Sequence, residues 1–120
     1  MRVELVCDFG FEAAHFLPSF PEGHKCRRLH GHSFRVRVVV EGQVPEERGY
    51  LVDYADIDEA MRPLLDRLDH HLLNEIEGLE NPTSEVLARW IWRQLEAALP
   101  GLAEVEVRET CTSRCRYRGG

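Results

Sequence analysis

Alternation along the first fifteen residues constrains this chain more than any other feature. Every odd position from Val3 to His15 is apolar, cysteine or histidine, and the charged side chains fall on even positions. Period-two alternation predicts a β-strand with one buried face. Gly10 lies inside this segment and is a candidate β-bulge, which would shift the parity of the residues after it.

Three later segments also read as strands. From His30 to Val40 the apolar and histidine positions are even. A third alternation runs from Val105 to Cys111 and places Glu109 on its apolar face, and residues 115–118 add a short fourth piece. Each of the first three apolar faces therefore also carries a chemically reactive group.

Two helices are predicted between the second and third strands. The first has a helical apolar stripe, with Asp53 or Asp56 as N-cap and Pro63 expected to kink or break it. The second starts near residues 81–83 and stops at Pro100-Gly101. Their stripes are Ile57, Met61, Leu64, Leu65 and Leu68, and then Leu87, Ile91, Leu95 and Leu99. This order predicts an α+β fold, with helices on one face of an antiparallel sheet.

Chain length and net charge limit the classes of protein to which this chain can belong. The 120 residues fit one domain, residues 1–120, and 43% of them are hydrophobic, enough for a core without disulfides. A formal charge of −6 argues against a nucleic-acid or anionic-membrane surface. With no long apolar run, no secretory signal pattern and four cysteines without a disulfide framework, we expect a cytoplasmic protein with reduced thiols.

Three histidines fall on the predicted apolar faces. His15 ends the first strand, and His30 and His32 open the second on one face. Together they would make a three-histidine zinc site with an open fourth position, the arrangement of catalytic zinc. Taken separately, the His30-x-His32 pair and His15 are each more typical of ordinary hydrogen-bonded histidines, and it is the coincidence of all three on apolar faces that favours a metal site.

Cys26 lies in a basic loop four residues before His30. Lys25, Arg27 and Arg28 surround it, and cationic neighbours favour a thiolate that can act as base or nucleophile. An inert thiol or a fourth zinc ligand are the alternatives. The same basic run is a candidate anion-binding loop.

Two further groups are candidates. The Asp69-His70-His71 run follows the first helix, where a histidine can also simply interact with the helix dipole. If residues 105–111 form a strand, Glu109 points inward. Its charge then needs a cationic partner or a planar ligand with paired N–H donors. A structural ion pair is the alternative role for Glu109.

Taken in order, these segments resemble the 6-pyruvoyltetrahydropterin synthase family, most of all its bacterial 6-carboxytetrahydropterin synthase branch, which serves queuosine biosynthesis. The likeness runs from about residue 8 to the C-terminus. Three residues separate Cys26 from His30, as in the carboxy branch, whereas the animal-type pyruvoyl synthases have a longer insertion. The motifs that carry the resemblance are residues 11–15, 26–32, 68–71, 81–85 and 109–112.

The resemblance implies roles for these residues. It makes the three histidines zinc ligands and Cys26 the catalytic proton acceptor. Asp69 and His70 match a catalytic Asp-His pair, and Glu109 matches the carboxylate that holds the guanidine-like edge of the pterin. Lys25, Arg27 and Arg28 are our own candidates for contacts to the triphosphate.

The resemblance also implies a tunnelling fold, in which the antiparallel sheets of several subunits close an oligomeric barrel. Active sites then lie between subunits, commonly in a homo-hexamer. The implied reaction of this lyase converts 7,8-dihydroneopterin triphosphate to 6-carboxy-5,6,7,8-tetrahydropterin, releasing acetaldehyde and triphosphate. The alternatives are a 6-pyruvoyltetrahydropterin synthase, which eliminates triphosphate from the same substrate, and a non-catalytic metal-binding module.

Overall fold

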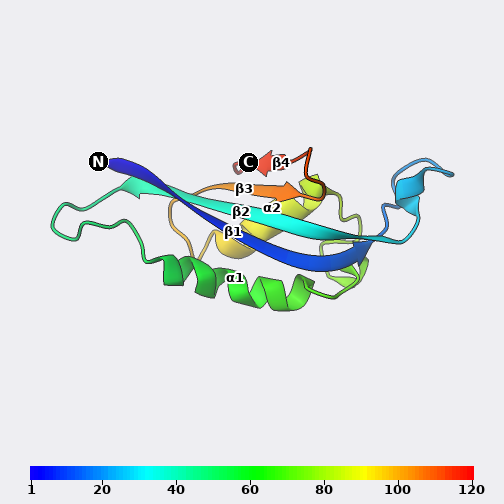
Figure 1. Cartoon of the computed structure of the whole chain (residues 1–120), viewed down its shortest axis with the longest axis horizontal. Coiled ribbons are helices and arrows are strands. Elements are labelled where there is room, and N and C mark those ends of the chain that lie inside the picture. The colour runs from blue at the N-terminus through cyan, green and yellow to red at the C-terminus, as the bar shows by residue number, and fades with distance from the viewer.

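A long hairpin organises the molecule. In the computed structural model, which describes residues 1–120, β1 (Arg2–His15) pairs with β2 (His30–Gln43) along its whole length (Figure 1). Each strand has 14 residues and so spans about 46 Å. The hairpin therefore sets the long axis of the molecule, 58 Å against 24 and 23 Å in the other directions.

The predicted bulge at Gly10 is wrong. Gly10 pairs directly with Arg35, and the parity of β1 holds to its end. A Cβ atom at this position would overlap the Arg35 guanidinium, so the glycine is explained by the arginine that lies across it. The register shifts elsewhere, between Val39 and Val40, where β2 pairs with β3.

Two shorter strands complete the sheet. β3 (Leu102–Arg108) pairs with β2, and β4 (Cys115–Tyr117) pairs with β3, giving the order β1-β2-β3-β4 with every pair antiparallel. The third strand was expected to reach Cys111 but ends at Arg108. Its chain then enters a turn in which Cys111 is exposed, so Cys111 does not share the buried face.

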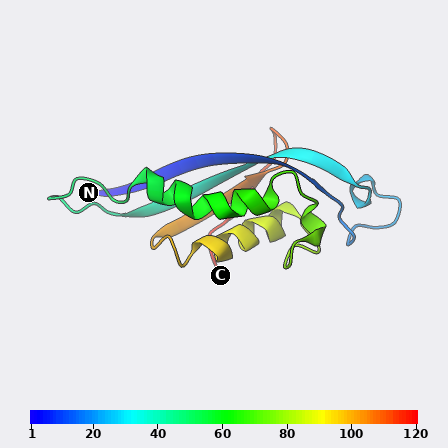
Figure 2. The same cartoon turned by 90° about the horizontal axis from the view of Figure 1, so that it is seen from below.

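Both helices cover one face of the sheet, as predicted (Figure 2). α1 (Tyr54–Leu68) begins at the N-cap Asp53, whose side chain accepts a hydrogen bond from the amide of Ala55. Pro63 does not break α1. It lies on the exposed side of the helix, where water can bind the carbonyl that the ring leaves without a partner.

α2 (Ser84–Leu95) is shorter than its apolar stripe suggested. Its N-cap is Thr83, which accepts a hydrogen bond from the amide of Val86. Leu99 lies in the turn after the helix, yet it is buried with the rest of the stripe. Short 3₁₀ helices form at η1 (Lys25–Arg27) and η2 (Leu73–Glu75).

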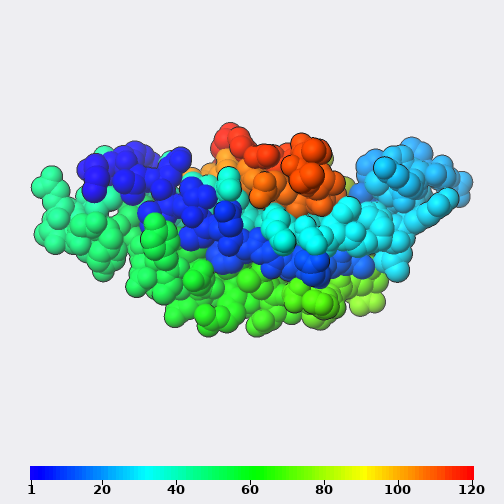
Figure 3. Space-filling model, viewed as in Figure 1, coloured from blue at the N-terminus to red at the C-terminus, as the bar shows by residue number.

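The core lies between the helices and the sheet. Its fully buried members include Phe34 from β2, Ile57 and Met61 from α1, and Leu87 and Ile91 from α2. The loop between β1 and β2, light blue in Figure 3, projects beyond this core at one end of the hairpin. No helix combines the length and apolar character that crossing a membrane requires.

Candidate metal centre

Three imidazoles meet where β1 ends and β2 begins. His15 lies directly opposite His30 in the antiparallel register, and His32 follows two residues later on the same face. One nitrogen from each ring lies within 4.8 Å of the others. The predicted triad is therefore brought together by strand parity and by the register of one hairpin.

Backbone carbonyls orient two of these rings. His15 Nδ1 lies 2.9 Å from the carbonyl oxygen of Pro82, and His30 Nδ1 lies 2.7 Å from that of Arg28. A carbonyl only accepts, so both Nδ1 atoms carry the proton and both Nε2 atoms present lone pairs. Such backbone contacts are typical of metal-binding histidines.

The two Nε2 atoms lie only 3.0 Å apart. Two lone pairs at that separation need a proton or a cation between or beside them. Since the same rings already donate through Nδ1, a shared cation satisfies both without a change of tautomer. The arrangement therefore fits a metal ion.

Burial favours the neutral form of two of these histidines, His15 and His32. His15 is fully buried, and burial lowers its pKa to about 4, with the Pro82 contact opposing the shift and His30 and His32 adding to it. Burial, and then His30, also lowers the pKa of His32. Neutral imidazole is the form that binds metals, so these side chains are ready to coordinate near neutral pH.

No fourth protein ligand completes the cluster, which consists of the three histidines alone. The nearest carboxylate contact places Glu109 Oε2 3.8 Å from His32 Nε2. Three protein ligands with a free fourth position are typical of catalytic rather than structural zinc sites.

Cys26 lies beside the triad. It shares a cavity of about 470 Å³ with His30, His32 and Glu109. Its backbone is fixed on both sides, because its amide donates to His24 Nδ1 at 3.1 Å and its carbonyl accepts from the amide of Leu17 at 2.9 Å. Cys26 is half-buried and is not bonded to another cysteine.

Glu109 also lines this cavity. It follows the end of β3 rather than continuing it, and its side chain is still largely buried. Burial raises its pKa, His30 opposes that shift and Glu85 adds to it. A buried carboxylate without an ion-pair partner closer than 3.8 Å is suited to a ligand that brings N–H donors.

Asp69 and His70 are not brought to this cavity. Asp69 Oδ2 lies 2.9 Å from His70 Nδ1, and both side chains are exposed. The pair is held at the outer edge of β1, where Glu12 donates its amide to Asp69 Oδ1 and accepts from the amide of His70. His70 instead lines a second cavity, of about 580 Å³, together with His32. Within one chain, the predicted catalytic groups therefore form two sets, which line different cavities that have Gly31 and His32 in common.

The basic loop residues differ in what they contact. Lys25 lines the Cys26 cavity. Arg27 donates to the carbonyls of Pro18 and Phe20, both at 2.8 Å, and thereby braces the loop. The Arg28 side chain is exposed.

Sequence reasoning missed two contributors to the site. The Pro82 carbonyl, at the start of α2, orients His15, and Thr110 lines the Cys26 cavity. The sequence predicts a helix start at residues 81–83 and a family motif at residues 81–85, but a backbone carbonyl leaves no side-chain signal of its own.

Comparison with known proteins agrees with this architecture. The family model described as 6-pyruvoyl tetrahydropterin synthase matches residues 4–120. The chain is 52% identical to 6-carboxy-5,6,7,8-tetrahydropterin synthase of a Synechocystis species, covering 92% of this chain and 88% of that protein. It is 35% identical to the protein of that name in Bacillus subtilis, with coverages of 96% and 84%.

A solved structure shows the same fold. The 6-pyruvoyl tetrahydropterin synthase of Caenorhabditis elegans superposes with a TM-score of 0.91 at 26% identity, over 100% of this chain and 97% of that one. The chain therefore belongs to the 6-pyruvoyl tetrahydropterin synthase family.

Proposed function

We propose that this protein is a 6-carboxy-5,6,7,8-tetrahydropterin synthase, a carbon–carbon lyase acting on 7,8-dihydroneopterin triphosphate. One observation carries the assignment: two members of an open three-histidine cluster, His30 and His32, line a cavity with Cys26 and the largely buried Glu109. Relatives at 52% and 35% identity bear that name, which favours the carboxy product over the pyruvoyl one.

Zinc is the metal we assign to the cluster, held by His15, His30 and His32. Three neutral imidazoles suit zinc, and their fixed Nδ1 contacts set the geometry before the metal binds. When bound, zinc would supply Lewis acidity toward the side-chain oxygens of the substrate.

The chain's own residues would do the remaining work. Cys26, on the wall of the cavity, accepts a proton from the substrate side chain. Glu109 binds the guanidine-like edge of the pterin through paired hydrogen bonds, and those donors offset the burial that raises its pKa. Lys25, Arg27 and Arg28 remain our candidates for the triphosphate.

A second copy of the chain would complete the active site. Asp69 and His70 lie on the β1 edge and do not line the Cys26 cavity, which favours their acting on a substrate there from a neighbouring copy. This supports active sites between subunits of a homo-oligomer, for which we propose a hexamer. His70, paired with Asp69, is the second proton-transfer group.

This chemistry fits a role in queuosine biosynthesis in the cytoplasm, which we propose on the family resemblance. The second candidate function is a 6-pyruvoyltetrahydropterin synthase, since the family model carries that description. A non-catalytic metal-binding module would hold zinc without converting any pterin.

Product analysis tests the proposal. Zinc-loaded protein is incubated with 7,8-dihydroneopterin triphosphate, and the pterin product is identified by mass. A 6-carboxytetrahydropterin product supports the assignment. A 6-pyruvoyl product would transfer it to the second candidate, and zinc binding without turnover would leave only the metal-binding module.

A further inference from the structure

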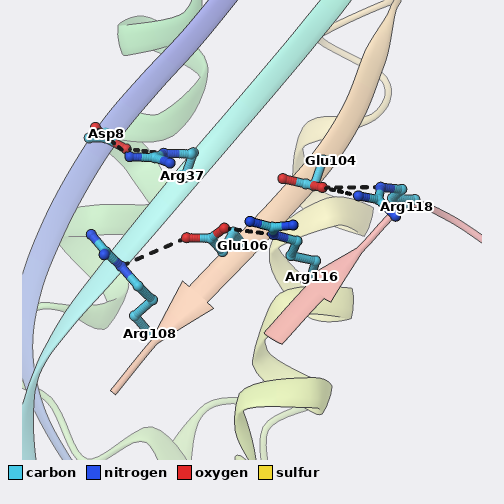
Figure 4. Close-up of polar contacts among 7 residues, drawn as sticks. All are labelled: Asp8, Arg37, Glu104, Glu106, Arg108, Arg116 and Arg118. Atoms are coloured by element: carbon cyan, nitrogen blue, oxygen red, sulfur yellow. Dashed lines mark hydrogen bonds and ion pairs between the residues drawn. The ribbon is translucent and has the colours of Figure 1, made fainter. Parts of the chain in front are cut away.

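The face of the sheet opposite the helices carries rows of charge that run across the strands (Figure 4). One row contains Asp8, Arg37, Glu106 and Arg116, each directly opposite the next in the register. Asp8 binds Arg37 at 2.8 Å, and Glu106 binds Arg116 at 2.9 Å. Glu106 is only 1% exposed, so this face is built around fixed ion pairs.

Both edges of the sheet are free, but along different lengths. The outer edge of β1 is bonded only from Glu12 onward, where Asp69, His70 and His71 cover it. From Arg2 to Phe11 that edge has no partner. β4 is likewise paired on one side alone. Unpaired edges of this kind are templates for another chain.

The directions of the strands permit two copies to join through these edges. Every neighbouring pair in the order β1-β2-β3-β4 is antiparallel, so β4 runs opposite to β1. The β4 edge of one copy can therefore pair with the β1 edge of the next in an antiparallel ladder. Repeating that contact uses both edges of every copy and can close a ring.

The charges at the two edges are complementary. The charged face of β4 carries Arg116, and Arg118 directly follows this strand. The same face of β1 carries Glu4, Asp8 and Glu12, and its one cation, Arg2, is bound to Glu41. Asp8 is already held by Arg37 and Glu12 by Ser33, whereas Glu4 is exposed and has no partner in its own chain. Arg116 uses only Nε on Glu106, which leaves its two terminal nitrogens available.

Closure of a ring decides the register. In a closed barrel the strands are tilted relative to the barrel axis. A row of residues followed once around the barrel therefore ends at a different residue of the strand on which it began. Between neighbouring copies this displacement must be an even number of residues, because an odd number would place the charged face of one copy beside the apolar face of the next. Arg116 therefore cannot meet Asp8, the residue of its own row, and a shift toward Glu12 runs into the covered part of the edge. Shifts of two or six residues would place it against Val6 or Arg2, and a shift of four places it against Glu4.

We propose that Arg116 at the β4 edge of one copy binds Glu4 at the β1 edge of the next, and that this pair sets a four-residue stagger between copies. The inference rests on the proposed assembly from several copies. The same register places half-buried Leu5 opposite half-buried Cys115, and half-buried Val3 opposite half-buried Tyr117, on the other face. In this register the charged faces of the two copies adjoin each other, and so do their apolar faces.

A disulfide at this contact tests the register directly. Residues opposite each other in an antiparallel pair have Cα atoms about 4.5–5.5 Å apart, within the range a disulfide spans. With the four-residue stagger, Leu5→Cys should cross-link to the native Cys115 of a neighbouring copy upon oxidation. Phe9→Cys is the matched control, because it would face Cys115 if there were no stagger.

The expected result is a ladder of cross-linked chains for Leu5→Cys, seen on non-reducing gels, that disappears when Cys115→Ser is added. Phe9→Cys should give none. Cross-linking through Phe9→Cys, no ladder from Leu5→Cys, or a ladder that survives Cys115→Ser would overturn the register. The gel needs no substrate, so cross-linking by a protein without synthase activity would refute only the proposed function.

A charge exchange tests the pair itself. Glu4→Arg should weaken assembly at least about tenfold, measured by sedimentation over a range of protein concentrations, and adding Arg116→Glu should recover part of that loss. Glu59→Arg, an exposed charge change on α1, serves as the control. Assembly of Glu4→Arg equal to that of the wild type, or an exchange variant no better than Glu4→Arg alone, would overturn the proposal.

Discussion

His15 and His30 aim their Nε2 atoms at one point because each donates its Nδ1 hydrogen to a backbone carbonyl. The centre is thus fixed by backbone geometry, and burial is the main cause that lowers the pKa of His15 and keeps its ring neutral. Cys26 and Glu109 then flank the open side of the cluster. The proposed function assigns metal binding, proton transfer and binding of the pterin ring to different side chains, so substitutions can separate these three roles.

The metal assignment predicts the outcome of His30→Ala. We expect the purified wild-type protein to bind about one zinc per chain and the variant to lose both zinc and activity while staying folded, because the core does not depend on the metal. Metal analysis and circular dichroism measure the two properties. His71→Ala, outside the triad, is the control and should keep its zinc. Full zinc content in His30→Ala would refute the assignment.

Cys26 borders the cluster without belonging to it, which predicts a catalytic rather than a ligand role. Cys26→Ala should retain zinc and bind pterin, yet turn over roughly 10²-fold more slowly, the usual scale for losing a general base. Zinc content, pterin affinity and product formation are measured on one preparation. Loss of zinc along with activity would instead make Cys26 a ligand, and near-normal turnover would make it a bystander.

At the scale of elements, α2 connects core packing to the metal centre. Its stripe of apolar residues packs against the sheet, and its N-cap Thr83 directly follows Pro82, whose carbonyl holds His15. The start of a helix therefore fixes the orientation of a ring on β1. Stability and metal affinity should be linked at this point.

Thr83→Ala tests that link. The substitution removes the hydrogen bond to the Val86 amide and should lower the free energy of unfolding by about 1 kcal/mol, the usual value for an N-cap. Zinc affinity should fall as well, because the Pro82 carbonyl is less firmly placed. Thr83→Ser keeps the hydroxyl and should restore both properties. A zinc affinity unchanged in Thr83→Ala would show that the cap and the centre are independent.

Periodicity in the sequence predicted the elements well, and the exceptions have local causes. Alternation placed β1 and β2 and so brought the three histidines together. It failed at Gly10, where a long side chain on the neighbouring strand, rather than a bulge, explains the glycine. It also extended β3 too far, because Glu109 continues the stripe in sequence while the backbone has already left the ladder.

The sequence does not show that the predicted catalytic residues lie in two different places on the chain's surface. Asp69 and His70 follow α1 in the chain, and only the fold shows that they cover the end of the outer edge of β1 and do not line the Cys26 cavity. Motif order records which residues a family uses and not which copy supplies them. The Pro82 contact was hidden for another reason, since any residue type offers a carbonyl.

At the scale of the whole molecule, these two sets of residues predict complementation between inactive variants. Cys26→Ala and His70→Ala should each be nearly inactive alone. When the two variant chains are co-expressed and assemble at random, about a quarter of the sites would combine Cys26 from a His70→Ala chain with His70 from a Cys26→Ala chain. Activity near a quarter of the wild-type value is expected, and a mixture no more active than the separate variants would place both groups in one chain.

The reaction itself gives the most direct test of the central claim. Chelator-treated protein and zinc-reloaded protein are incubated with 7,8-dihydroneopterin triphosphate, and pterin mass and acetaldehyde are measured together. We expect the zinc-reloaded protein alone to form 6-carboxy-5,6,7,8-tetrahydropterin, with about one acetaldehyde per pterin, because zinc supplies the Lewis acidity that the chain's own residues lack. A pyruvoyl product without acetaldehyde, or equal turnover by the chelated protein, would contradict the account.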